Sequence, residues 1–198
     1  MKTLVMNSAC MMIIVMLIWS CREDKVTDAN AGVTSDQSAT EVQKVSAPSL
    51  DIHTAAYLGD LNGVRQHIKA GTDLDQKDQY GSTPLIIATT FGKTDVARAL
   101  IEAGADLSVA NNEGSTPLHI AAFFCKPEIV EILLANGADK AVRNNYGSTA
   151  WETVSGPFDQ VRSIYDAIGS SLEPLGMKLD YTYLEATRPK IAEMLQDG

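Results

Sequence analysis

An internal repeat of 33 residues constrains the fold of this chain more than any other feature. Residues 78–110 read DQYGSTPLIIATTFGKTDVARALIEAGADLSVA, and residues 111–143 read NNEGSTPLHIAAFFCKPEIVEILLANGADKAVR. The two segments share GSTPL near their start and GAD near their end. Repeats of about this length are typical of solenoids, in which each unit buries its apolar face against its neighbours. The period therefore predicts a stack of similar units.

Each repeat contains the signals for two short helices followed by a turn. A Thr-Pro pair, at Thr83 and again at Thr116, can begin the first helix, because threonine caps free amides and proline fits the first turn. Gly92 permits a left-handed turn between the two helices. The second helix has one apolar face, whose residues recur in both repeats as Val96, Leu100 and Ile101, then Ile129, Leu133 and Leu134.

These motifs resemble the ankyrin-repeat family. The resemblance implies an all-α fold, an ankyrin-repeat solenoid of stacked helix pairs with β-turn fingers. The first repeat lacks the Thr-Pro pair, and Gly156-Pro157 interrupts the first helix of the last repeat, so we expect both to cap the stack. The expected repeats occupy, within the span 49–168, about residues 49–77, 78–110, 111–143 and 144–168.

We expect residues 169–198 to form a connector and capping helices that close the stack. The connector would occupy residues 170–176, after a helix that ends the fourth repeat. Asp180 can begin one short helix, and Thr187 can begin a second one with Pro189 in its first turn.

The N-terminal residues predict a targeting segment. Lys2 precedes an apolar run over residues 9–19, which is too short to span a bilayer but suits a signal peptide. The run ends in Ile-Trp-Ser-Cys, which resembles a bacterial lipobox. The resemblance implies that residues 1–20 are a lipoprotein signal peptide and that acyl chains on Cys21 anchor the protein to a membrane. Simple secretion and an uncleaved anchor are the alternatives.

The segment after the lipobox predicts where and how the domain is held. Arg22 follows Cys21, in place of the aspartate associated with inner-membrane retention, which points to the outer membrane and its periplasmic side. Residues 21–48 contain no aromatic residue and are rich in Ser, Thr, Asp and Ala. Such a composition buries too little apolar surface to offset the entropy of ordering. We therefore expect a flexible tether between membrane and repeats.

Charge and motifs argue against several function classes. The formal net charge of −9 repels phosphate backbones, so we expect no nucleic-acid partner. The sequence has no phosphate-binding loop, GxSxG or HExxH motif, and we expect no enzyme activity, cofactor, metal or small-molecule substrate. His53 and His119 share one repeat position, where the resemblance implies a structural hydrogen bond between neighbouring units.

Cys125 departs from the repeat pattern. It occupies the position of Gly59 and Gly92 between the two helices, where a positive φ favours glycine. One interpretation is a tolerated substitution. The other is a redox-responsive thiol or an intermolecular disulfide, because Cys125 would be the free thiol of a lipidated protein in an oxidising compartment.

Aromatic residues mark a candidate partner-binding surface. They recur just before the turn between the helices and at the finger tips, the places that line the concave face in the ankyrin family. Aromatic side chains are common anchors of interfaces. The alternative is that the phenylalanines pack in the core. The candidate residues are Tyr57, Tyr80, Phe91, Glu113, Phe123, Phe124 and Tyr146.

These observations predict a membrane-tethered scaffold that binds a protein partner in the bacterial cell envelope. A redox or enzymatic role for Cys125 and a purely structural envelope protein are the alternative hypotheses.

Overall fold

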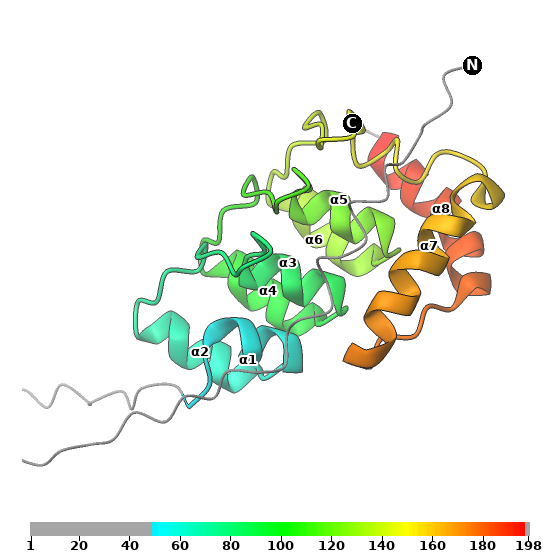
Figure 1. Ribbon diagram of the computed structural model, residues 1–198. Coiled ribbons are helices and arrows are strands. Elements are labelled where there is room, and N and C mark those ends of the chain that lie inside the picture. Colours follow the sequence, from blue (N-terminus) through cyan, green and yellow to red (C-terminus); the bar gives the residue numbers. More distant parts are fainter. Residues whose placement is uncertain (1–48, 197–198) are drawn as a thin grey trace, which may run out of the picture. The chain divides into compact units, whose positions relative to one another are not determined.

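The computed structural model describes residues 49–196, and the predicted signal peptide, the tether and the lipidation site Cys21 lie outside the described residues (Figure 1). The described residues form helices and turns, with no strand. In chain order the helices are α1 (Ile52–Leu58), α2 (Leu61–Lys69), α3 (Pro84–Thr90), α4 (Thr94–Glu102), α5 (Pro117–Phe123), α6 (Pro127–Ala135), α7 (Phe158–Leu172), the 3-10 helix η2 (Glu173–Leu175) and α8 (Tyr181–Gln196).

Three helix pairs stack in two layers. Helices α1, α3 and α5 pack side by side in one layer, and α2, α4 and α6 form the second layer behind them. Alanines keep the first-helix layer narrow, since Ala55, Ala88 and Ala121 have no exposed surface. The apolar face predicted for the second helices is buried at Val96, Leu100, Ile129 and Leu133. The all-α stack of helix pairs predicted from the repeat is confirmed.

The predicted caps begin the helices of the two regular repeats. Thr83 accepts a hydrogen bond from the Ile86 N–H (3.3 Å), and Pro84 occupies the first position of α3. Thr116 and Pro117 also begin α5, and there the Thr116 N–H donates to the ring nitrogen Nδ1 of His119 (3.3 Å). The first repeat, which lacks the Thr-Pro pair, has an aspartate cap instead. Asp51 accepts a hydrogen bond from the Thr54 N–H at 3.0 Å. A carboxylate at this position satisfies a free amide as a threonine would.

The finger turns share one internal geometry. The side-chain oxygen of Asp78, Asn111 or Asn144 accepts the backbone N–H groups two and four residues later. Short polar side chains of this kind stabilise turns by bonding to their own backbone. Adjacent fingers are also joined by their backbones, since the Asn112 N–H donates to Tyr80 O (3.3 Å) and the Asn145 N–H donates to Glu113 O (3.0 Å). The fingers therefore form a connected row.

The fourth repeat keeps its finger but loses its first helix. Residues 150–157 form turns up to Gly156-Pro157, as the helix-breaking pair predicts. The helix that follows is longer than expected, because α7 has 15 residues and continues through 170–172, where we predicted a connector. The connector prediction was wrong over those residues. Burial of Leu172 explains the extension, since it lies two and four helical turns beyond Tyr165 and Phe158 on the same face.

One helix forms where two were predicted at the C-terminal end. Asp180 caps α8 by accepting from the Tyr183 N–H (3.0 Å), but the helix continues through Thr187 and holds Pro189 in its interior. The prediction of a second start at Thr187 was wrong. A continuous buried stripe, formed by Leu184, Ile191 and Leu195, overrides the local preference of proline.

The stack is closed by this helix. Helix α8 packs against α5 and α6, the last regular pair. Within residues 49–196, no helix combines the length and hydropathy that crossing a membrane requires.

We predict that Pro189→Ala stabilises the protein. Pro189 and Glu185, whose carbonyl would receive the missing N–H bond, are both exposed, so alanine restores a helical hydrogen bond without disturbing the core. The free energy of unfolding should rise by about 1–2 kcal/mol, less than the full helical cost of proline because proline also restricts the unfolded chain.

Urea unfolding followed by circular dichroism measures this change. Lys190→Ala, at an exposed neighbouring position of α8, is the matched control and should change stability by less than about 0.5 kcal/mol. A loss of stability in Pro189→Ala would mean that the proline shapes α8 for packing.

Candidate functional site

The seven candidate residues separate into two groups. Tyr80, Glu113 and Tyr146 occupy successive finger tips. The second group lies at or just after the C-terminal ends of the first helices, and we call it the aromatic ladder: Tyr57, Phe91, Phe123 and Phe124.

The finger tips are accessible. Tyr146 is 52% exposed, Glu113 is exposed and Tyr80 is half-buried. Backbone hydrogen bonds between adjacent fingers fix the spacing of the tips, because Tyr80 O and Glu113 O each accept an N–H from the next finger. An exposed row on a rigid backbone can meet a partner with little loss of conformational entropy. These three residues therefore stay a predicted partner-binding surface.

Two separate ring contacts lie within the aromatic ladder, one between the first two repeats and one inside the third. The rings of Tyr57 and Phe91 meet edge to face with centroids 4.7 Å apart, and those of Phe123 and Phe124 meet likewise at 5.1 Å. Phe124 is 7% exposed, and the other three are half-buried. The four side chains thus follow the ends of the first helices in the first three repeats as two separate pairs.

Two residues of the aromatic ladder contact the chain's own C-terminal region, so the alternative of packed phenylalanines describes Phe123, while the partner-binding role of the set stays a prediction. Tyr165 of α7 stacks on Phe123 at 4.5 Å between centroids, and its hydroxyl donates to Phe123 O at 2.6 Å. At the other end, the Tyr57 hydroxyl donates to Leu175 O of η2 at 2.8 Å. Helix α7 therefore extends from the third repeat back to the first (Figure 1).

A buried arginine, which sequence reasoning missed, holds α7 to α8. Arg188 is 2% exposed and donates through Nη1 to the Tyr165 hydroxyl (2.9 Å) and through Nη2 to Gly156 O (3.2 Å). Burial raises the pKa of Tyr165 to about 12, so the phenol stays protonated. No ion pair joins Arg188 to a carboxylate among residues 49–196. Its hydrogen bonds fix the first half of α7 in place. Nothing in the sequence around Arg188, which stands beside Pro189, indicates that this arginine is buried.

Cys125 has the positive φ that its glycine position predicts, with φ at 51°. Its side chain has no exposed surface, and its sulfur lies 3.8 Å from Leu184 O of α8. Burial raises the pKa of the Cys125 thiol to about 11. Because the thiolate is the reactive form, this environment favours the interpretation as a structural substitution over a redox role.

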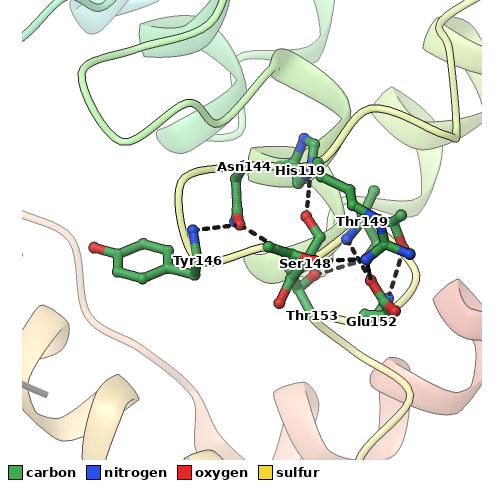
Figure 2. A network of polar contacts seen from close by, with 10 residues as sticks. His119, Asn144, Tyr146, Ser148, Thr149, Glu152 and Thr153 are labelled. Atoms are coloured by element: carbon green, nitrogen blue, oxygen red, sulfur yellow. Dashed lines mark hydrogen bonds and ion pairs between the residues drawn. The ribbon is translucent and has the colours of Figure 1, made fainter. Parts of the chain in front are cut away.

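His119 links the third repeat to the fourth. His119 Nδ1 accepts the Thr116 N–H at 3.3 Å, so the ring proton is on Nε2, which donates to Ser148 O at 3.0 Å (Figure 2). Burial lowers the pKa of His119 and favours this neutral form. His53, at the same repeat position, donates through Nε2 to Gln76 O at 3.0 Å near the end of its own repeat. The His119 contact agrees with the structural role that the family resemblance implies.

The finger of the fourth repeat is held by a second polar cluster. Glu152 accepts from the Thr149 N–H (2.7 Å) and from Arg143 Nη1 (2.6 Å), while Arg143 also donates to Gly147 O (2.5 Å) (Figure 2). These contacts fix the loop that carries the exposed Tyr146.

Comparisons with known proteins agree with this architecture. The family model described as "Ankyrin repeats (3 copies)" matches residues 52–144, the three stacked pairs and the start of the fourth finger. A stretch of 66 residues is 38% identical to the human DNA-binding protein RFXANK, covering 32% of this chain and 25% of that protein. The chain thus spans about a quarter of the curated relative that it matches. The fold is that of ankyrin repeats, which are protein-interaction modules, and no catalytic family is indicated.

We predict that Cys125 resists alkylation in the folded protein. A rise of the thiol pKa from 9.0 to about 11 lowers the thiolate fraction about 100-fold at pH 8, and burial blocks access further. Iodoacetamide labelling, followed by mass spectrometry of the peptide that contains Cys125, should be at least about 100-fold slower in native buffer than in urea. Fast labelling of the folded chain would instead support a redox thiol.

Proposed function

From the ankyrin repeats of residues 52–144, we propose that this protein is a membrane-tethered scaffold that binds a protein partner in the bacterial cell envelope. The exposed row of finger tips supports this proposal more than any other single observation. Its side chains are spaced by one repeat and stand on a hydrogen-bonded backbone. Such a row offers a long, preorganised surface of the kind that protein partners bind.

The chemistry of the row indicates the kind of contact. Tyr146 and Tyr80 present aromatic rings with hydroxyl groups, which suit anchors that combine apolar area with a hydrogen bond. Glu113 stands between them and adds one negative charge. A protein surface with an apolar pocket and a basic side chain matches this arrangement. The net charge of −9 does not favour a nucleic-acid partner.

The tether is proposed from the sequence of residues outside the described part. The apolar run over residues 9–19 and the lipobox-like end before Cys21 favour lipidation, and Arg22 favours the outer membrane. A lipid anchor followed by residues 21–48 would let the repeats search for partners near the periplasmic side of the membrane. The scaffold then needs no cofactor.

We predict that the double variant Glu113→Ala/Tyr146→Ala loses partner capture. Cross-linking of the purified protein to an envelope extract, quantified by mass spectrometry, should fall at least about tenfold for the specific partner, because a central aromatic anchor contributes about 2 kcal/mol. Both side chains are exposed, so the fold should be unchanged.

The double variant Glu102→Ala/Glu131→Ala is the matched control. It changes exposed residues of α4 and α6 in the second-helix layer. The finger-tip proposal fails if this control loses the partner while the finger-tip variant keeps it.

We predict that Cys21→Ser releases the protein from membranes. Removal of the acylated cysteine removes the hydrophobic anchor, so the protein should move from the membrane pellet to the soluble fraction after cell lysis. Cys10→Ser, within the apolar run of the signal peptide, is the matched control and should leave the protein in the pellet. Retention of Cys21→Ser in the pellet would argue against lipidation at this residue.

A further inference from the structure

The two halves of α7 are attached to the repeats unequally. Phe158 and Tyr165, in the first half, belong to the buried core that joins the repeats to α8. Leu172, in the second half, is buried but lies outside that core. The first half is also fixed by the hydrogen bond of Arg188 to Tyr165. The second half of α7 is therefore held by fewer buried side chains than the first half.

That second half is also a poor helix by composition. Gly169 gains little from helix formation, because glycine loses the most backbone freedom. Ser170 and Ser171 donate through their hydroxyls to the carbonyls of Asp166 (2.9 Å) and Ala167 (3.0 Å), a pattern that weakens helices. The segment ends at Gly176, whose φ of 77° gives the chain a turn there. We call residues 169–176 the latch.

The latch contacts the aromatic ladder at Tyr57 of the first repeat, and Tyr57 in turn contacts Phe91 of the second. Tyr57 bonds to Leu175 O, and its ring contacts Phe91 edge to face. Neither Tyr57 nor Phe91 belongs to the buried core or to the half-buried apolar residues packed against it. Opening the latch would therefore free the Tyr57 hydroxyl beside the half-buried Tyr57 and Phe91 rings without dismantling the stack. Such rings are typical anchors for a partner.

We propose that the latch is the resident occupant of a second docking surface, formed by Tyr57 and Phe91, and that this surface takes an amphipathic helix of a protein partner. The proposal rests on the proposed function, because it names a second surface of the same interaction module. The latch itself indicates the chemistry of the occupant. Its Leu175 carbonyl accepts from the Tyr57 hydroxyl. Its buried Leu172 lies on the face of α7 that carries Tyr165, two helical turns further on.

A partner must displace the latch, so its apparent affinity depends on how often the latch is open. Affinity for a site that is open only part of the time is reduced by the open fraction. Variants that loosen the latch should therefore raise apparent affinity, and variants that strengthen it should lower it. These opposite signs distinguish a displaceable latch from a permanent part of the fold.

The probe is a fluorescein-labelled peptide with the sequence of residues 166–176, in which Gly169, Ser170 and Ser171 are replaced by alanine to favour a helix. Its binding to the full chain is measured by fluorescence anisotropy. Leu172→Ala in the chain should raise the apparent affinity at least about tenfold, because a buried leucine no longer holds the latch closed. Ser170→Ala/Ser171→Ala in the chain should lower it by about threefold.

Two controls complete the experiment. The same peptide with alanine in place of Leu172 should not bind. Leu74→Ala in the chain, at a half-buried apolar residue packed on the core of the stack, is the matched destabilising control and should leave the affinity unchanged. Hydrogen exchange of α4 and α6 confirms that each variant is folded.

Equal affinity for the wild-type, Leu172→Ala and serine-to-alanine chains overturns the proposal, as does an absence of binding to folded Leu172→Ala. This assay needs no natural partner. Its failure would leave the finger-tip surface intact, whereas a failed capture at the finger tips would leave the latch result unaffected.

Discussion

Burial of one helix pair against the next is the interaction on which the rest of this structure depends. Alanines in α1, α3 and α5 bring the first helices close together, and leucines and valines of the second helices fill the space behind them. Since each pair buries its apolar face only on a neighbour, the last pair needs a cover. The fourth repeat does not supply one, because residues 150–157 form turns. Helix α8 takes that place on α5 and α6.

This way of closing the stack divides the binding surface in two. Arg188 of α8 holds Tyr165, and Tyr165 in turn places α7 on Phe123. The aromatic ladder then contacts the C-terminal region at Tyr57 and Phe123, while two of the three finger-tip residues are exposed. A scaffold of three helix pairs thus offers one candidate surface at the finger tips and a second one beside the C-terminal region. The second surface can be used only at the cost of moving the latch, so the two surfaces differ in how readily a partner reaches them.

The sequence predicted the repeats well and the C-terminal helices poorly, for a physical reason. Threonine caps, glycine turns and the apolar face of the second helix are local signals that recur with the period, and the structure has each of them. The second helix start predicted at Thr187-Pro189 and the connector predicted from Ser170 onward were also inferred from local sequence signals. Tertiary burial overrides both, through Ile191 in α8 and Leu172 in α7. The contacts of the aromatic ladder with the C-terminal region depend on the same long-range packing, which no short motif encodes.

Cys125 illustrates how a departure from a repeat can follow from its place in the stack. A side chain at Gly59 would approach Lys93 of the next repeat to 2.9 Å, and one at Gly92 would approach Lys126 to 3.2 Å. Those lysines therefore cover the two glycine turns. No regular fourth repeat supplies such a lysine beyond Cys125, and α8 packs there instead. The Cys125 side chain fills the space beneath α8, and its burial offsets the strain of about 1 kcal/mol or more that a positive φ costs a residue other than glycine.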